Sequence, residues 1–192
     1  MSTSTRITVD QYQEMTARGD FEPREQHRVE LIRGEIVPKF SDDPRTPMNP
    51  PHAGAIMELT DWSFEVSPRG LVRVSIQCSI SITALDSVPD PDITWLARKD
   101  YSRELPTPGD VLLLIEVSDT TIAKDRGPKL ELYAEAGIRE YWIVDINRRR
   151  ILVHRDPHGT TYRSMTTFVP GQEARTLAFP DISLPVSRIF PD

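Results

Sequence analysis

The sequence contains a single cysteine, Cys78, among its 192 residues. One thiol cannot close a disulfide within the chain, and a structural zinc site would have to be assembled from histidines and carboxylates alone. The chain also lacks any run of about eighteen consecutive apolar residues, the length that a membrane-spanning helix requires. We therefore expect a soluble, globular protein that is stabilised by a hydrophobic core and does not enter a membrane.

The sequence also has no excess of positive charge. It contains 23 Lys and Arg and 29 Asp and Glu, which gives a formal net charge of -6. Proteins that coat nucleic acid usually carry a basic stripe, so this balance disfavours that class. It does not exclude a metal-dependent nuclease, because carboxylates at a metal site lower the net charge while a local basic rim still binds phosphates. Residues 1–8 lack the apolar core of a signal peptide, so we expect a cytoplasmic location.

The length fits one domain, which would bury about two-thirds of the surface of the unfolded chain. We divide it into a peripheral N-terminal helical region (1–22), a core (23–169) and a C-terminal tail (170–192) whose prolines favour a path over the surface. The order of the predicted elements indicates an α/β (α+β) fold, in which helices flank a mixed central sheet that carries additional antiparallel strands.

Local patterns place these elements along the chain. Thr8 and Gln11 form a capping-box pattern and Gly19 is a natural helix stop, so a helix is predicted over 8–18. Further elements follow from hydrophobic periodicity and turn residues. They are a hairpin over 28–40, a loop over 41–51, helices over 52–66 and 128–136, and strands over 71–82, 92–97, 111–117, 140–145, 151–154 and 160–169.

The clearest alternation runs through the predicted strand 71–82, where apolar residues from Val72 to Ile82 alternate with polar ones. A strand with this pattern has one buried and one polar face. Cys78 would lie on the buried face and Gln77 on the polar face, which makes Gln77 a candidate to point toward a functional site.

Three polar residues stand at positions that a folding sequence alone does not explain. Asp92 begins a predicted strand, Glu116 lies near the end of an otherwise apolar one, and Lys129 lies in the next helix. Two carboxylates can hold one or two Mg²⁺ ions, and a lysine beside them can orient a water or stabilise negative charge on a phosphate. Burying Glu116 without a cation would be costly, so a metal is one compensation and a structural salt bridge to Lys129 or Arg126 is the other.

Longer segments resemble the Uma-type family of restriction endonucleases, formerly a domain of unknown function, within the PD-(D/E)XK nuclease superfamily. The Pro-Asp pair at Asp92 and the run Glu116-Val117-Ser118 match the superfamily signature, except that Ser118 stands where the signature has lysine. In several branches of the superfamily the lysine has moved to the following helix, and Lys129 is placed to do this. The segments that carry the family resemblance are 29–37, His52, 89–93, 115–118, Thr120 or Thr121, Asp125, Lys129, Tyr133, 136–138 and 140–145.

This resemblance implies a restriction-endonuclease-like core, a divalent metal (Mg²⁺ or Mn²⁺), a homodimer, and hydrolysis of phosphodiester bonds in nucleic acid, with DNA as the expected substrate. Carried over position by position, Asp92 and Glu116 would be metal ligands and Lys129 the catalytic lysine. Glu30 would be a further acidic group that reaches the metal or its water. On a solvent-facing strand, Glu30 would instead pair with a neighbouring arginine.

Three more residues are candidates for supporting roles. His52, at a helix start, could contact phosphate or simply be solvated, and Gln77 could face the site or make cross-strand hydrogen bonds. Asp125 is predicted to orient Lys129, four residues later on the same helix face, or to cap the helix. Three aromatic residues are expected to pack in the core rather than to stack on bases. They are Tyr133, Tyr141 and Trp142.

Scattered basic residues could form a rim that binds the phosphate backbone, or could be plainly solvated. They are Arg98, Lys99, Lys124, Arg126, Arg148, Arg149 and Arg150. The nuclease hypothesis competes with a catalytically silent module that keeps the fold but only binds nucleic acid or protein, which Ser118 and the acidic charge favour. A metal-dependent hydrolase of smaller phosphoesters is a third hypothesis.

Overall fold

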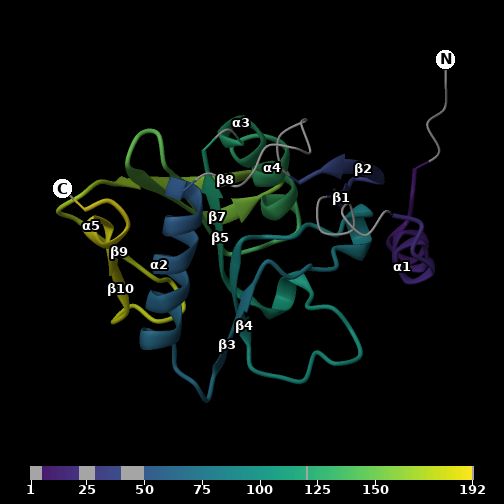
Figure 1. Ribbon diagram of the computed structural model, residues 1–192, viewed down its shortest axis with the longest axis horizontal. Helices are drawn as coiled ribbons and strands as arrows, with labels where there is room; N and C mark the ends of the chain where they lie inside the picture. Colours follow the sequence, from purple (N-terminus) through teal and green to yellow (C-terminus); the bar gives the residue numbers. More distant parts are fainter. Residues whose placement is uncertain (1–5, 22–28, 40–49, 120, 192) are drawn as a thin grey trace.

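A six-stranded sheet forms the centre of the protein. The computed structural model describes residues 6–21, 29–39, 50–119 and 121–191 (Figure 1). The strands of the central sheet are β3 (Val72–Ile76), β4 (Ile93–Ala97), β5 (Val111–Ser118), β6 (Glu140–Asp145), β7 (Arg150–His158) and β8 (Thr161–Phe168). They lie side by side in this order, and the sheet is mixed because β5 and β6 run parallel while the other neighbours run antiparallel.

The two parallel strands lie in the middle of the sheet and are almost completely buried. Parallel neighbours need a crossover connection, usually a helix, because a tight turn can only join antiparallel strands. Here the crossover consists of α3 (Ile122–Asp125) and α4 (Pro128–Glu135). Pro128 begins α4 and Gly137, with a φ of 78°, follows its last turn, as the sequence predicted.

Helix α2 (Pro50–Val66) covers one face of the sheet. Trp62 on α2 stacks on Trp95 of β4 and on Trp142 of β6, with ring centroids 5.1 and 5.9 Å apart. The indole N–H of Trp95 donates to the buried hydroxyl of Ser63 at 2.9 Å, so this polar group inside the core is satisfied. The packing of these three tryptophan rings therefore holds α2 against the sheet.

The C-terminal residues pack against the same face. β9 (Glu173–Arg175) and β10 (Ser183–Pro185) form an antiparallel ribbon, and α5 (Val186–Ile189) follows. Figure 1 shows this yellow segment beside α2, and both Leu184 and Val186 are fully buried in the core there. The prediction that the tail only follows the surface is wrong, because its apolar side chains complete this side of the core.

The N-terminal elements lie at the other end of the molecule. Helix α1 (Val9–Arg18) has the predicted capping box and glycine stop. β1 (Val29–Ile32) and β2 (Glu35–Pro38) form the predicted hairpin. Its turn residues, Arg33 and Gly34, have φ angles of 52° and 80°, the left-handed pair that two-residue hairpin turns require. Figure 1 shows α1 far from the C-terminal segment, and the α1 residues Val9 and Tyr12 are buried.

The long strand predicted over 71–82 is wrong in its second half. β3 ends at Ile76, because Gln77 adopts a left-handed φ of 49° and turns the chain out of the ladder. Cys78 is consequently exposed rather than buried. The chain continues through a short 3-10 helix, η1 (Thr83–Leu85), and a second one, η2 (Pro108–Asp110), precedes β5.

The remaining predicted elements are present with small shifts of their ends, and the predicted mixed central sheet flanked by helices with additional antiparallel strands is confirmed. The loop predicted over 41–51 falls mainly outside the described residues. Within the described part of the chain, none of the helices has the length and apolar character needed to cross a membrane.

Candidate active site

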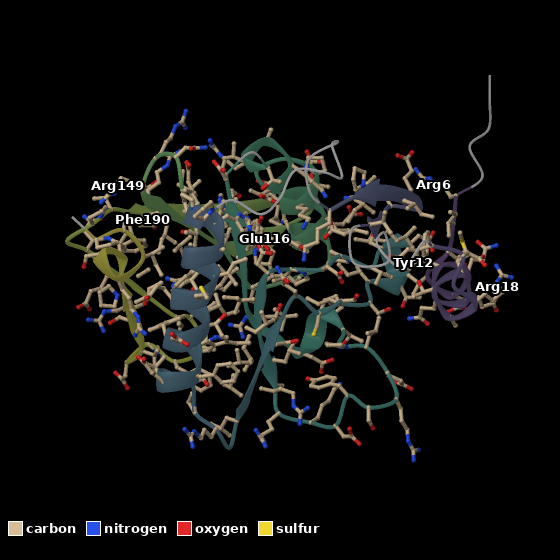
Figure 2. All side chains as sticks on the ribbon, in the orientation of Figure 1. Arg6, Tyr12, Arg18, Glu116, Arg149 and Phe190 are labelled. Atoms are coloured by element: carbon tan, nitrogen blue, oxygen red, sulfur yellow. The ribbon has the colours of Figure 1, made fainter. Side chains whose placement is uncertain are left out.

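Glu116 is the charged residue of the buried strand β5, and its carboxylate lies on the α4 side of the sheet. Its strand neighbours Ile115 and Val117 pack toward α2, so alternation along the strand turns Glu116 the other way. Lys129 Nζ and the hydroxyl of Tyr133 both donate to Glu116 Oε1 at 2.8 Å. Lys129 and Tyr133 are four residues apart on α4, so both point from one face of the helix. Figure 2 shows Glu116 near the middle of the molecule.

Asp92 lies directly across from Glu116. The antiparallel register pairs Ile93 of β4 with Ile115 of β5, so the residue before Ile93 comes next to the residue after Ile115. The backbone N–H of Val117 donates to Asp92 Oδ2 at 2.9 Å, which fixes the orientation of this buried carboxylate. The structure therefore brings the two predicted metal ligands together.

Glu30, on β1, is fully buried and joins the same group from the hairpin. Its Oε1 lies 2.9 Å from Lys129 Nζ and accepts the backbone N–H of Asp90 at 2.9 Å, while its Oε2 accepts from Lys124 Nζ at 2.7 Å. Burial opposes ionisation of Glu30, but the two ammonium groups outweigh it and lower the pKa to about 2. Glu30 is thus an anion that holds two lysines, and the alternative of a solvent-facing residue is wrong.

The ionisation of Glu116 is opposed by its surroundings. Burial raises the pKa of Glu116 to about 8; Lys129 opposes this shift, and the nearby carboxylates of Asp92, Asp125 and Glu30 add to it. Lys129, by contrast, is surrounded by carboxylates that raise its pKa well above the usual value despite its burial. Lys129 is therefore a permanent cation, and the group still carries more carboxylate than its lysines neutralise.

Asp125 makes different contacts from those predicted. Its Oδ2 accepts from the hydroxyls of Ser118 at 2.5 Å and Thr121 at 2.8 Å, and burial raises its pKa. Asp125 and Lys129 do not share a continuous helix, because α3 and α4 are separated at Gly127. Ser118, in the position where the superfamily signature has lysine, therefore fixes Asp125, and Lys129 approaches Glu116 from α4.

Several contributors to the site were not predicted as such. Tyr133 packs in the core as expected, but its hydroxyl also serves Glu116. Lys124 was assigned to a basic rim and instead binds Glu30. Lys39 Nζ lies 3.9 Å from Asp92 Oδ1, and Asp90, whose pKa is raised by burial, accepts the hydroxyl of Ser79. The repeated Pro-Asp of residues 89–92 was the available signal for Asp90.

The two remaining candidates lie at the margins. His52 is half-buried in the first turn of α2. The side chain of Gln77 is exposed, but its backbone N–H donates to the carbonyl of Asp92 at 3.0 Å, so Gln77 is next to the site through the main chain. The exposed side chain of Gln77 lies outside the buried charge network.

The basic residues considered as one rim are dispersed among separate surfaces. Lys99 and Arg150 form ion pairs with Asp110 and Asp145, at 2.7 and 2.9 Å. Arg149 donates to backbone carbonyls near the C-terminus. Arg98 lines one pocket, and Arg126 and Arg148 line another. Among the described residues of this basic set, Lys124 is the one that contacts a buried carboxylate of the site, that of Glu30.

The arrangement can accept a divalent cation between Asp92 and Glu116. Asp92 Oδ1, which lies 3.9 Å from Lys39 Nζ, and Glu116 Oε2 accept no hydrogen bond from the described residues. A cation would offset the burial and the neighbouring carboxylates that raise the pKa of Glu116. The described residues hold no ready-made cage of three or more His, Cys, Asp or Glu. Mg²⁺ commonly uses one or two carboxylates and completes its shell with waters and substrate phosphates, so the pair fits that ion.

Comparisons with known proteins agree with this architecture. A crystal structure of "a putative nuclease belonging to DUF820" from Anabaena variabilis ATCC 29413 superposes with a TM-score of 0.69 at 18% identity, over 96% of this chain and 97% of that one, which shows a shared fold. No curated protein matches the sequence. A family described as "putative restriction endonuclease", Uma2, matches residues 9–187, and the chain belongs to that family.

Proposed function

We propose that the protein is a metal-dependent endonuclease that hydrolyses phosphodiester bonds, with DNA as its substrate. The observation that carries this proposal is the buried group in which Asp92 and Glu116 face each other while Lys129 is held between Glu116 and Glu30. Such a group is costly to bury and serves no packing purpose, so a catalytic role explains it better than a structural salt bridge.

Asp92 and Glu116 are the residues that would hold Mg²⁺ or Mn²⁺. A bound divalent cation supplies a lowered pKa for a coordinated water and positive charge for the transition state of phosphodiester cleavage. Asp92 is held for this role by the N–H of Val117, and Tyr133 orients Glu116 through Oε1. The other oxygen of Asp92 lies 3.9 Å from Lys39 Nζ, and Glu116 Oε2 accepts no hydrogen bond from the described residues.

Lys129 acts as a fixed positive charge. Because its pKa is raised, it cannot take a proton as a general base near neutral pH; it can orient the attacking water or stabilise negative charge that develops on the phosphate. Glu30 positions Lys129 and Lys124 rather than binding the metal directly. This assignment changes the role first expected for Glu30.

Access for a phosphate is provided beside the two lysines. A pocket of about 500 Å³ opens between the β1–β2 hairpin and the start of α4, and Lys124, Lys129 and Arg33 are among the side chains that line it. Lys124 and Lys129 are paired with Glu30 and Arg33 is paired with Glu135, so the pocket offers a phosphate N–H donors rather than an excess of positive charge.

The proposal is tested by incubating supercoiled plasmid and single-stranded DNA with the purified protein and Mg²⁺ or Mn²⁺. Asp92→Asn and Lys129→Met are expected to lower the cleavage rate by about 100-fold or more, as loss of a charge-stabilising group does in other enzymes. The exposed-residue variants Asp61→Asn and Lys99→Met are the charge-matched controls and should cleave at the wild-type rate. Undiminished cleavage by both site variants, with folding verified by circular dichroism, would refute the assignment.

A further inference from the structure

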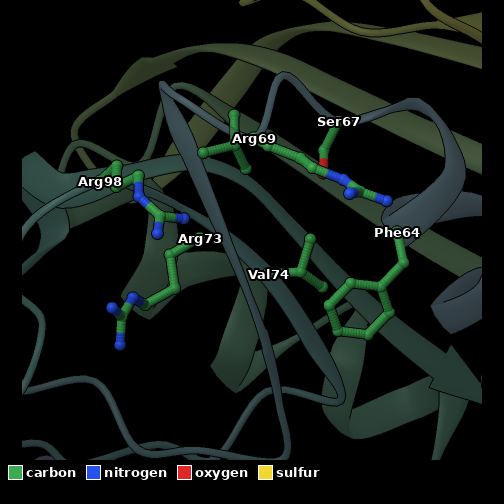
Figure 3. A pocket seen from close by; sticks show the side chains of 7 residues that line it. Phe64, Ser67, Arg69, Arg73, Val74 and Arg98 are labelled. Carbon is green, nitrogen blue, oxygen red and sulfur yellow. The ribbon is translucent and has the colours of Figure 1, made fainter.

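A second pocket lies at the open edge of the sheet, apart from the carboxylate group. β3 is the edge strand, and a pocket of about 430 Å³ forms where α2 ends and β3 begins. Its walls combine three arginines with three apolar side chains and a serine (Figure 3). Val72 and Ser67 complete the lining, and the other five residues are Arg69, Arg73, Arg98, Phe64 and Val74. We refer to these last five residues as the arginine pocket.

The three guanidinium groups of the arginine pocket have no ion-pair partner among the described residues. In the described parts of the chain, none of Arg69, Arg73 and Arg98 forms an ion pair with an acidic side chain. The carboxylate of Asp100 is close enough to Arg73 to be affected by its charge, but it accepts the N–H of Ser102 instead. Three exposed guanidinium groups in one pocket of an acidic protein are well suited to phosphate oxygens, which they can bind in a bidentate manner.

The arginine pocket connects to the carboxylate site along β3. β3 ends at Ile76, where Gln77 turns the chain out of the ladder. Within the strand, alternation turns Val74 toward α2, so Arg73 and Ser75 lie on the opposite face. That is the face of the sheet on which Glu116 lies, and Gln77 is bonded to Asp92 through its backbone. From Arg73 to Ile76 the extended chain spans about 10 Å. This part of β3 therefore leads from Arg73 toward Asp92 over roughly the length of three phosphates in a stacked strand.

Phe64 adds an aromatic surface to the pocket. Its side chain is on the last turns of α2 and the residue is 54% exposed, an unusual place for a large apolar ring. In Figure 3 the guanidinium groups of Arg73 and Arg98 extend to one side of the strand that carries Val74, and that of Arg69 lies on the other side, near Phe64. Cations next to an exposed ring are the combination by which proteins bind single-stranded nucleic acid.

We propose that the arginine pocket binds the phosphates and one unpaired base of a nucleic-acid strand whose scissile phosphate lies at Asp92 and Glu116. The inference rests on the proposed function for the position of the scissile phosphate. It further states that the enzyme binds a single-stranded segment next to that phosphate. A duplex, with a persistence length of about 50 nm, would have to be bent at a cost in energy to follow the turn around the β3 edge. An unpaired strand can make that turn and place a base on Phe64.

The test measures binding of a fluorescein-labelled single-stranded DNA of about 16 nucleotides, with excess EDTA so that no cleavage occurs. Arg73→Gln/Arg98→Gln is compared with wild type and with Arg139→Gln/Arg163→Gln, which removes two exposed arginines elsewhere. Loss of two phosphate contacts should make the slope of log Kobs against log salt concentration shallower by about 1.4, at about 0.7 for each contact on a single strand. The control variant should keep the wild-type slope.

A second pair of variants tests the aromatic contact. Phe64→Ala is expected to weaken binding of the single strand about tenfold, with little effect on the corresponding duplex. Met57→Ala removes another exposed side chain of α2, 67% exposed, and should leave both affinities unchanged. An equal loss of affinity for duplex and single strand in Phe64→Ala would contradict the stacked, unpaired base.

The possible results separate this inference from the proposed function. Protein that binds DNA through the arginine pocket but never cleaves it would refute the nuclease proposal alone. Protein that cleaves DNA while Arg73→Gln/Arg98→Gln keeps the wild-type affinity and salt slope would overturn the pocket proposal alone. A dimer that dissociates in this variant without loss of DNA affinity would assign the β3 edge to a second copy of the chain, and would likewise overturn it.

Discussion

At the scale of single residues, the site depends on a small number of donors that serve several carboxylates. Lys129 is shared between Glu116 and Glu30, and Tyr133 provides the second donor to Glu116. Because burial and the neighbouring carboxylates raise the pKa of Glu116, each donor that stabilises its anion also favours metal binding by that anion.

We predict that Tyr133→Phe raises the metal concentration needed for half-maximal cleavage about tenfold, as loss of a hydrogen bond to a metal ligand does elsewhere. The substitution keeps the packed ring and removes the hydroxyl that donates to Glu116 Oε1. The stability should fall by about 1 kcal/mol, the usual cost of a lost hydrogen bond. Cleavage rates at graded Mn²⁺ concentrations and urea unfolding measure the two effects.

Tyr162→Phe is the matched control, because it also removes one buried tyrosine hydroxyl, which donates to the carbonyl of Ile138 at 2.8 Å. Its stability cost should be similar, while its metal dependence should equal that of wild type. Equal metal dependence of the two variants would show that the hydroxyl of Tyr133 serves packing only.

The sequence identified the charged centre of the site but not its supports. Glu116 could be recognised because a lone carboxylate in an apolar strand contradicts the local pattern, and Asp92 and Lys129 followed from the motif. Lys39 could not, because it approaches Asp92 only after the hairpin and the loop before β4 fold against each other. For Asp90 the repeated Pro-Asp of residues 89–92 was the available signal. Tyr133 was correctly placed in the core, yet no periodicity reports which buried hydroxyl meets a carboxylate.

At the scale of elements, the break between α3 and α4 sets the relative positions of the two lysines that bind Glu30. Gly127 lies at this break, and a Cβ atom there would come within 2.8 Å of the backbone carbonyl oxygen of Ala123. A backbone atom cannot move aside in the way that the end of a flexible side chain can. A larger residue at 127 must therefore shift α4, which carries Lys129, relative to α3, which carries Lys124.

We predict that Gly127→Ala lowers the free energy of unfolding by about 1–3 kcal/mol and reduces cleavage, because overpacking displaces the helix. Gly54→Ala is the control: its Cβ would meet nothing within 4 Å, and alanine in the middle of α2 should raise stability by about 0.5–1 kcal/mol. Urea unfolding and cleavage rates of both variants check the prediction. Wild-type activity and stability of Gly127→Ala would show that the break tolerates a side chain.

Element types were largely predictable, whereas one boundary was not. Helix caps, the Arg33-Gly34 turn and the apolar run of β5 are local signals, and the structure follows them. The alternation over 71–82 was also a local signal, but it continues beyond the point where Gln77 turns out of the sheet. The apolar residues after that turn are buried in another core cluster. The alternation therefore predicted their burial correctly, but the strand that it also predicted there is not formed.

At the scale of the whole molecule, two core clusters lie on the two faces of the central sheet. The C-terminal segment could not be placed from its sequence, because its prolines signal irregular chain while its burial depends on a surface that α2 and the sheet create together. On the other face, the core includes a titratable residue, His154 of β7, whose ring stacks on Tyr141 and lies tilted against Tyr162, with ring centroids 5.9 and 5.8 Å away.

We predict that His154 makes the fold sensitive to mild acid. Burial, with a smaller effect from Arg126, lowers the pKa of His154 to about 4, whereas the unfolded chain titrates near 6.5. The unfolded state therefore takes up the proton first, and stability is lost as the pH falls from 6.5 toward 4. In His154→Phe, which keeps a ring in the stack, the loss of unfolding free energy between pH 7 and pH 5 should be smaller by about 1 kcal/mol after allowance for solvent screening. An identical loss in both proteins would exclude His154 as the cause.

Calorimetric titration of Mn²⁺ into the wild-type protein and into Asp92→Asn/Glu116→Gln measures whether Asp92 and Glu116 together hold a divalent cation. Both substitutions keep the side-chain shape and remove the charge, so the fold should persist while the metal loses its ligands. We predict saturable binding to the wild type and none to the double variant. Equal binding by both proteins, or no binding by the wild type, would contradict the assignment.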